Sequence, residues 1–165
     1  MPSFDISSDV DWQEIDNAIN QTIKELTNRF DFKAIKFEIQ MDKKEKTITL
    51  WCSEEGKLDS LNDSLQTKVI KRGLSLLALD YQEAQPATGD SVRQVICVQA
   101  GVSKEKGKDI IAALKESKLK IQSQIQDEKV RVTAKNKDTL QEAIQFLKGR
   151  QDSLKLPLQF GNYRD

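Results

Sequence analysis

The order in which short strands and amphipathic helices follow one another constrains this fold more than any other feature. Hydrophobic periodicity predicts a β-α-β-β-α-β order in residues 1–90 and the same order again in residues 91–165. A whole supersecondary unit that occurs twice in one chain indicates duplication. We therefore expect two similar domains, 1–90 and 91–165, joined by a polar segment at 82–91 that contains Pro86 and Gly89.

In the first half, a capping pattern and helical spacing predict the first helix. Asp11 precedes it, and Glu14 follows three residues later, as in a capping box. Apolar residues then recur at steps of three and four, at Trp12, Ile15, Ile19, Ile23 and Leu26. A second helix carries Leu58, Leu61, Leu65 and Val69. Strands are expected at residues 3–7, 36–41, 47–52 and 76–81.

The second half repeats this plan. Strands are expected at residues 92–99, 120–125, 129–133 and 157–160. Ser103 is expected to cap the first helix of this half, and Asn136 or Asp138 to begin the second. The repeated order is that of the ferredoxin-like, or split βαβ, fold. The predicted class is therefore α+β, with two tandem ferredoxin-like domains. Each has a four-stranded antiparallel sheet, helices on one face and an open opposite face.

Composition narrows the chemistry that the chain can perform. There is no histidine, which removes the commonest general base, the serine and cysteine triads and most zinc sites. Cys52 and Cys97 form no CxxC pair, so two reduced thiols in strands are expected, with a disulfide or a metal role as the alternative. No apolar run has the length of a membrane helix, and the N-terminus lacks a signal-peptide pattern. We expect a cytoplasmic protein with no cofactor, no metal and no membrane partner.

The charges are balanced overall but unevenly divided. Residues 1–90 contain 11 Lys and Arg against 17 Asp and Glu, whereas residues 91–165 contain 15 against 9. A basic half next to an acidic half is compatible with contact to a polyanion, with association of unlike surfaces, or with an ordinary solvated surface.

Cations and amides alternate along the predicted hairpin of the second half. Lys129 and Arg131 share one face of their strand, while Lys120, Gln122 and Gln124 share one face of the partner strand. Cations suit phosphate groups and amides suit base edges, although a solubilising charged surface has the same spacing. The complete set of predicted nucleotide- or nucleic-acid-binding residues is Arg29, Lys33, Lys71, Arg72, Lys118, Lys120, Gln122, Gln124, Lys129, Arg131, Lys135, Lys137 and Arg164.

Two other features of the sequence have some of the properties of binding sites. Trp51 is the one aromatic residue expected on its strand, so stacking of bases on paired aromatics is poorly supported, and interface or sheet packing explains it as well. The segment 101–108 has five residues between its glycines and no Ser or Thr after its last lysine, so it is not a P-loop. Two interpretations of this segment remain, a weak anion site at the helix N-terminus and a plain capped helix.

Several separated segments resemble the YajQ family, in order and over the whole chain. They are Pro2–Ile6, Arg29–Lys33, Lys71–Gly73, Lys118–Gln126, Val130–Thr133 and Gln159–Asp165. The sequence departs from the family pattern at Ala134-Lys135-Asn136, where relatives tend to have Gly-Lys-Lys, and at residues 150–155, where they tend to have a glycine-rich stretch.

The resemblance implies two ferredoxin-like domains that exchange their N-terminal strands, so that residues 3–7 pair in the second sheet and residues 92–99 in the first. It also implies a cytosolic nucleotide- or nucleic-acid-binding protein without catalytic activity. The first hypothesis is thus a non-catalytic binder of nucleotide or RNA phosphates. The alternative is a protein-interaction or regulatory scaffold, or a homo-oligomer, with a small nucleotide effector. An acyl phosphate hydrolase using Asn162 and Arg164 is a third, weaker hypothesis.

Overall fold

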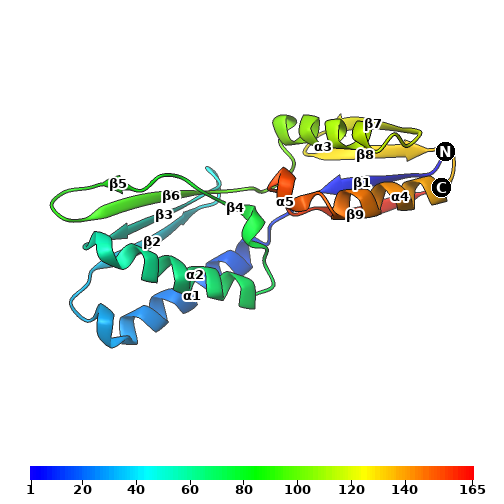
Figure 1. Cartoon of the computed structure of the whole chain (residues 1–165). Coiled ribbons are helices and arrows are strands. Elements are labelled where there is room, and N and C mark those ends of the chain that lie inside the picture. Colours follow the sequence, from blue (N-terminus) through cyan, green and yellow to red (C-terminus); the bar gives the residue numbers. More distant parts are fainter. The chain divides into compact units, whose positions relative to one another are not determined.

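The computed structural model describes residues 1–165 and contains two antiparallel sheets (Figure 1). The α+β class with antiparallel sheets is therefore confirmed. The strands are β1 (Ser3–Ser7), β2 (Phe37–Asp42), β3 (Thr47–Cys52), β4 (Leu79–Tyr81), β5 (Gln85–Pro86), β6 (Val92–Val98), β7 (Ile121–Gln126), β8 (Lys129–Ala134) and β9 (Gln159–Arg164). The helices are α1 (Trp12–Asn28), α2 (Leu58–Lys71), α3 (Lys104–Glu116), α4 (Lys137–Lys148) and the single turn α5 (Gln151–Leu154). None of these helices is both long and apolar enough to cross a membrane.

The chain divides into two compact units, each of which includes one strand from the other half of the sequence. Unit 1 contains Met1–Val10 and Gln99–Asp165, and unit 2 contains Asp11–Val98. The reason is strand pairing. β1 lies between β8 and β9 in the sheet ordered β7-β8-β1-β9, whereas β6 lies between β3 and β4 in the sheet ordered β2-β3-β6-β4 (Figure 1).

This division of the chain also changes the charge of each part. Asp5 and Asp9 belong to unit 1, and Arg93 belongs to unit 2. Unit 1 therefore carries 14 Lys and Arg against 11 Asp and Glu, and unit 2 carries 12 against 15. The electrostatic difference between the two parts is half of what the contiguous halves indicated, which weakens any argument from net charge alone.

Segment 82–91 is part of the unit 2 sheet rather than a linker. β5 pairs with the start of β6, with Pro86 opposite Val92, and the N–H of Ala87 donates to the carbonyl of Ser91 at 2.9 Å. β4 and β5 follow one another along the same edge of β6, because β3 occupies the other edge. The sheet thus has five strands where four were expected.

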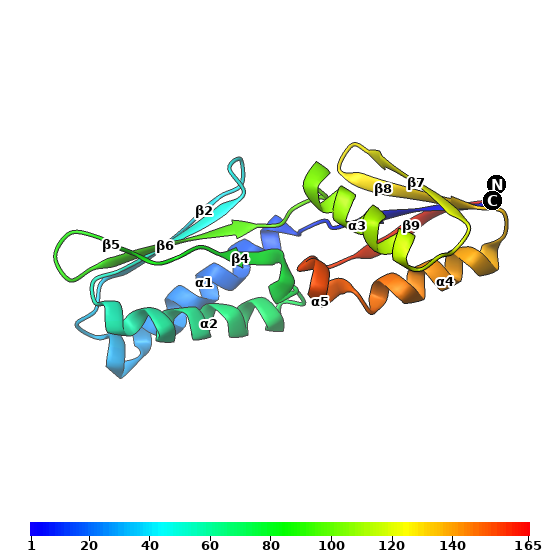
Figure 2. The same ribbon diagram turned by 45° about the horizontal axis from the view of Figure 1, so that its top comes forward.

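Each sheet buries one face against its own helices. In unit 1 the core joins Phe4 and Ile6 of β1, Val130 and Val132 of β8, and the apolar faces of α3 and α4. In unit 2, α1 and α2 lie side by side on one side of the sheet (Figure 2). The capping predictions hold at three helices: Asp11, Ser103 and Asn136 each accept hydrogen bonds from backbone N–H groups of the first turn.

Candidate functional site

The open face of the unit 1 sheet carries the predicted binding residues of the β7–β8 hairpin. Val130 and Val132 of β8 are fully buried, so the intervening side chains, from Lys129, Arg131 and Thr133, lie on the opposite face. The register places Gln126, Gln124 and Gln122 of β7 directly opposite these three residues, respectively. The cation and amide rows expected from the sequence are therefore adjacent in the sheet.

Arg131 is engaged in an internal network. Its Nε donates to Oδ1 of Asp5 on β1 at 3.0 Å, and Nδ2 of Asn162 on β9 donates to Oδ2 of Asp5 at 2.7 Å. Burial acts to raise the pKa of Asp5, but the hydrogen bonds from Arg131 and Asn162 and the Arg131 charge outweigh it, so this pKa lies below its ordinary value. Arg131 is thus largely neutralised by Asp5 and is not a free phosphate ligand.

The lowered pKa of Asp5 predicts that the stability of the fold depends on pH. A carboxyl with a depressed pKa stabilises the fold above its unfolded pKa of about 3.9, and this contribution is lost as pH falls through the folded value. We expect Asp5→Asn to lower the free energy of unfolding by about 1–2 kcal/mol near neutral pH. The difference in stability between this variant and the unmodified chain should shrink as the pH falls below about 3.9. Urea unfolding of both chains at several pH values measures this difference. A difference that does not change with pH contradicts the lowered pKa of Asp5.

A pocket opens where the end of β8 meets the start of α4. We call it the α4 pocket; its volume is about 360 Å³. Its polar lining comes from Lys120, Gln122, Thr133, Lys135, Asn136 and Thr139. Lys120 and Lys135 are exposed and no carboxylate pairs with them. Asn136 accepts from the N–H of Thr139 at 2.9 Å, which leaves the first N–H groups of α4 open to another acceptor. The pocket can hold an anion.

The remaining predicted residues of unit 1 lie outside the α4 pocket. Lys129 lines a smaller pocket with Arg131, where Asp5 and Asp127 offset their charge. Lys137 pairs with Asp165 at 2.6 Å, although both side chains are largely exposed. Lys118 has a left-handed backbone conformation in the turn after α3, and Arg164 is exposed at the end of β9.

The four predicted cations of unit 2 lie on its helical layer and at two separate places. Arg72 at the end of α2 makes two 2.9 Å hydrogen bonds to Glu14 at the start of α1. α1 and α2 are therefore antiparallel, and Arg29 and Lys33 follow the far end of α1, about 25 Å along the helix. Arg29 pairs with Asp31 at 2.9 Å. The Arg29–Lys33 and Lys71–Arg72 clusters thus do not form one site with each other.

Pairing with Arg72 also determines the role of Glu14, which the sequence predicted to complete a capping box. Its carboxylate accepts from Arg72 and from Asn17 instead of returning to the N-cap N–H. The hydrogen bonds from Arg72 and Asn17 hold the pKa of Glu14 below its ordinary value. The pair fixes α1 against α2 and leaves Arg72 with little capacity for a ligand.

Some polar residues near these faces were not found from the sequence. Thr133, Asn136 and Thr139 line the α4 pocket; the strand alternation could have identified the first as a site residue, and the helix cap the second. Arg93 of β6 lies directly opposite Trp51 of β3 on the open face of unit 2, and both line a pocket of about 260 Å³. No local signal joins these two, because they are distant in sequence and meet through sheet pairing. No group of three His, Cys, Asp or Glu side chains is placed to hold a metal ion.

Two antiparallel sheets, each with helices on one face, place the chain in the class of small α+β proteins. Comparison with known proteins narrows this class. The family model described as "Nucleotide-binding protein YajQ-like" matches residues 2–164. The chain belongs to this family.

Relatives match over their full lengths. A protein from Trichlorobacter lovleyi is 53% identical over 165 residues, which is 100% of both chains. One from Geotalea uraniireducens is 54% identical over 164 residues, 99% of each chain. A protein from Carboxydothermus hydrogenoformans is 45% identical over 162 residues, 98% of this chain and 97% of its own. All three are named "Nucleotide-binding protein".

Proposed function

We propose that this chain binds a nucleotide, or the phosphates and bases of a nucleic acid, in the α4 pocket, and that it does so without catalysis. The observation that carries the proposal is the meeting of Lys120, Lys135 and the N-terminus of α4 around one cavity. Relatives that span the whole chain are named for nucleotide binding, and this supports the same ligand class here.

The chemistry of the pocket suits a phosphate group beside a base. The first N–H groups of a helix and its dipole attract an anion, and two lysines with no carboxylate partner add charge-assisted hydrogen bonds. Gln122 presents both an amide donor and an amide acceptor from the adjacent strand, as a base edge requires. Arg131, which the sequence placed in the site, contributes by holding Asp5 and the sheet together.

We also infer that both units have the ferredoxin-like topology. In the unit 1 sheet, β1 opens the β-α-β-β-α-β order and lies between the third strand, β8, and the fourth strand, β9, with β7 at the edge. In the unit 2 sheet, β6 occupies the corresponding position between β3 and β4, with β2 at the edge, although it follows these strands in the sequence. Cytoplasmic location and the lack of catalysis belong to the same proposal. A chain without histidine lacks the residue that most often moves protons near neutral pH, and this favours binding over catalysis.

Replacing the two free lysines tests the site. We expect Lys120→Gln with Lys135→Gln to weaken nucleotide binding by about a hundredfold or more, since each of the two lost charge-assisted contacts contributes about 1.5–3 kcal/mol. The matched control is Lys104→Gln with Lys108→Gln, which removes two exposed lysines of α3 outside the pocket. Calorimetric titration of mono- and dinucleotides measures the affinities. Equal losses in both double variants would place the site elsewhere.

A salt series separates a small nucleotide from a polynucleotide. Binding of an RNA oligomer releases many counterions, so its affinity should fall steeply between about 50 and 200 mM salt. A nucleotide held in the α4 pocket makes few phosphate contacts and should show a shallow slope. Absence of saturable binding to either ligand at low salt contradicts the proposed function.

A further inference from the structure

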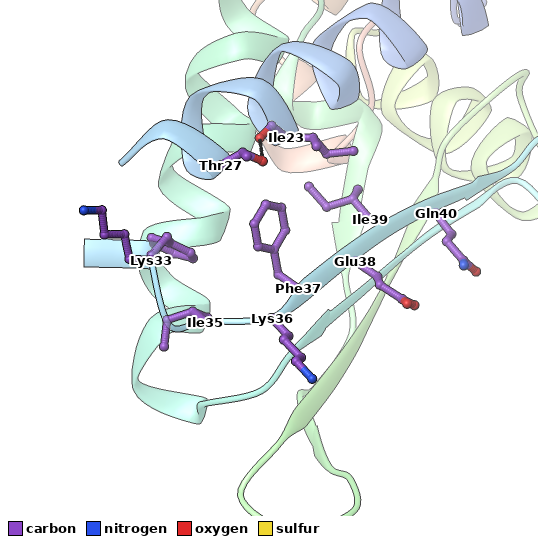
Figure 3. A pocket seen from close by; sticks show the side chains of 10 residues that line it. Ile23, Thr27, Lys33, Ile35, Lys36, Phe37, Glu38, Ile39 and Gln40 are labelled. Carbon is purple, nitrogen blue, oxygen red and sulfur yellow. Dashed lines mark hydrogen bonds between the residues drawn. The ribbon is translucent and has the colours of Figure 1, made fainter. Parts of the chain in front are cut away.

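The free edge of β2 has no covering element. β2 is the terminal strand of the unit 2 sheet, and its partner β3 occupies its other edge. A groove of about 580 Å³ lies between α1 and β2 (Figure 3). Phe37 and Ile39 point from the strand toward Ile23 of α1, while Glu38 and Gln40 point away from α1. An open, partly apolar edge is a place where another strand can pair.

The backbone groups along this edge can be assigned from the ladder. Lys36 makes two hydrogen bonds with Ser53. The Ser53 N–H donates to the Lys36 carbonyl at 2.8 Å, and the Lys36 N–H donates to Ser53 Oγ at 3.0 Å. In an antiparallel ladder alternate residues face the same neighbour, so the even-numbered residues of β2 face β3. The N–H and C=O groups of Phe37, Ile39 and Met41 therefore point outward without a partner.

We propose that β2 is a self-association edge, at which a second copy of this chain pairs antiparallel about a two-fold axis at Ile39. Phe37 then lies opposite Met41 of the second copy, and Ile39 opposite its own counterpart. These outward-facing residues align in three hydrogen-bonded pairs, which form about six backbone hydrogen bonds. The interface is isologous, as a closed dimer requires.

Charge favours this register over the two neighbouring registers. Centred on Ile39, the pairing sets Lys36 opposite Asp42 of the second copy twice, and Glu38 opposite Gln40 twice. A shift of the register by one residue pair in one direction sets Glu38 against Glu38, and in the other sets Glu38 against Asp42. Like charges directly opposite destabilise a strand pair, so the register centred on Ile39 is favoured over these two.

The apolar residues agree with the same arrangement. Phe37 and Met41 are half-buried in the isolated chain, and both lie on the side of the sheet that faces α1. Pairing brings them together and brings Ile39 against its counterpart, at the floor of the groove that also contains Ile23. Burial of this apolar surface adds to the hydrogen bonds and the ion pairs. The free backbone groups, the charged residues and the apolar residues of this edge are thus all complementary to those of a second copy of the chain.

Sedimentation velocity over a concentration series tests the proposal. We expect a concentration-dependent dimer in the unmodified chain. Lys36→Glu sets an acidic residue against Asp42 at two symmetric places and should raise the dissociation constant by about tenfold or more. The matched control is Lys44→Glu, an identical charge change in the exposed turn after β2, which should leave the dimer intact. A monomer at every concentration of the unmodified chain overturns the proposal.

A mixing experiment tests the register itself. Lys36→Glu and Asp42→Lys chains should each be monomeric alone, but an equal mixture should form a heterodimer, because both cross-pairs then join opposite charges. Native mass spectrometry distinguishes the two chains by mass. Asp42 also accepts a hydrogen bond from the Glu45 N–H at 3.1 Å in an exposed turn, so thermal melts verify that each variant is folded. Folded variants that stay monomeric when mixed contradict this register.

A proline scan distinguishes the two sheets. Met41→Pro removes an outward N–H that no strand of the isolated chain uses, so it should abolish the dimer while the chain stays folded. Ser123→Pro makes the corresponding change on β7, the edge strand of unit 1, and should leave the dimer intact. Dissociation by Ser123→Pro with an unaffected Met41→Pro dimer overturns the assignment to β2.

Discussion

Replacement of Phe4 by alanine is expected to destabilise unit 1 by about 3–5 kcal/mol, the usual cost of emptying a large aromatic site in a core. Phe4 is fully buried in β1, opposite Val132 of β8. Its ring packs edge-on against Phe160 of β9, with 6.0 Å between ring centroids, and against Tyr163. A cavity at this position therefore weakens three adjacent strands, two of which lie more than 120 residues further along the chain.

Hydrogen exchange resolved along the sequence is the measurement for Phe4→Ala. Faster exchange is expected in β8, β9 and α4, because they share a core with β1, and exchange in α1, α2 and β3 should change little. Slow exchange retained in β8 together with faster exchange in β3 would show that β1 belongs to the other sheet.

Replacement of Ile96 by alanine is expected to destabilise the other unit, unit 2, by about 2–5 kcal/mol. Ile96 is fully buried in β6, where it lies opposite Ile48 of β3 and Tyr81 of β4. Although it stands in the second half of the sequence, it lies in the sheet of the first half.

The same exchange experiment checks Ile96→Ala. Residues of β3, β4 and α2 should lose protection, whereas those of β8 and α4 should keep it. Phe4→Ala and Ile96→Ala serve as controls for each other, since both empty a buried site and differ in the sheet that they affect. Faster exchange in unit 1 after Ile96→Ala would contradict the pairing of β6 with β3.

Local sequence patterns located most elements. Alternation at residues 3–7 and 47–52 predicted strands with the bounds that β1 and β3 have. The last strand was the clearest error: residues 157–160 were expected, and β9 is Gln159–Arg164. Gly161-Asn162 has the composition of a turn, and Asn162 does have a positive φ of 52°. Pairing with β1 nevertheless continues past it, through an irregularity between Ser3 and Asp5.

The candidate site was predictable in residue type but not in grouping. Alternation correctly placed Gln122 and Gln124 beside Thr133 and Arg131 on one face, since side-chain direction has a period of two along a strand. Which cations are free depends on contacts between distant segments. Arg131 has Asp5 as its partner, 126 positions earlier, whereas Lys120 and Lys135 have none and line the α4 pocket.

By itself, the sequence determined the repeated order of strands and helices, the helix caps and the absence of histidine chemistry, because each depends on residue type and short-range spacing. Local patterns did not indicate the exchange of strands β1 and β6, which only the family resemblance implied, and the tertiary structure decided the charge of each unit and the partner of Arg131. Hydrogen bonding between strands is set by the burial of whole faces across the chain, and short-range periodicity carries no information about which distant strand completes a sheet.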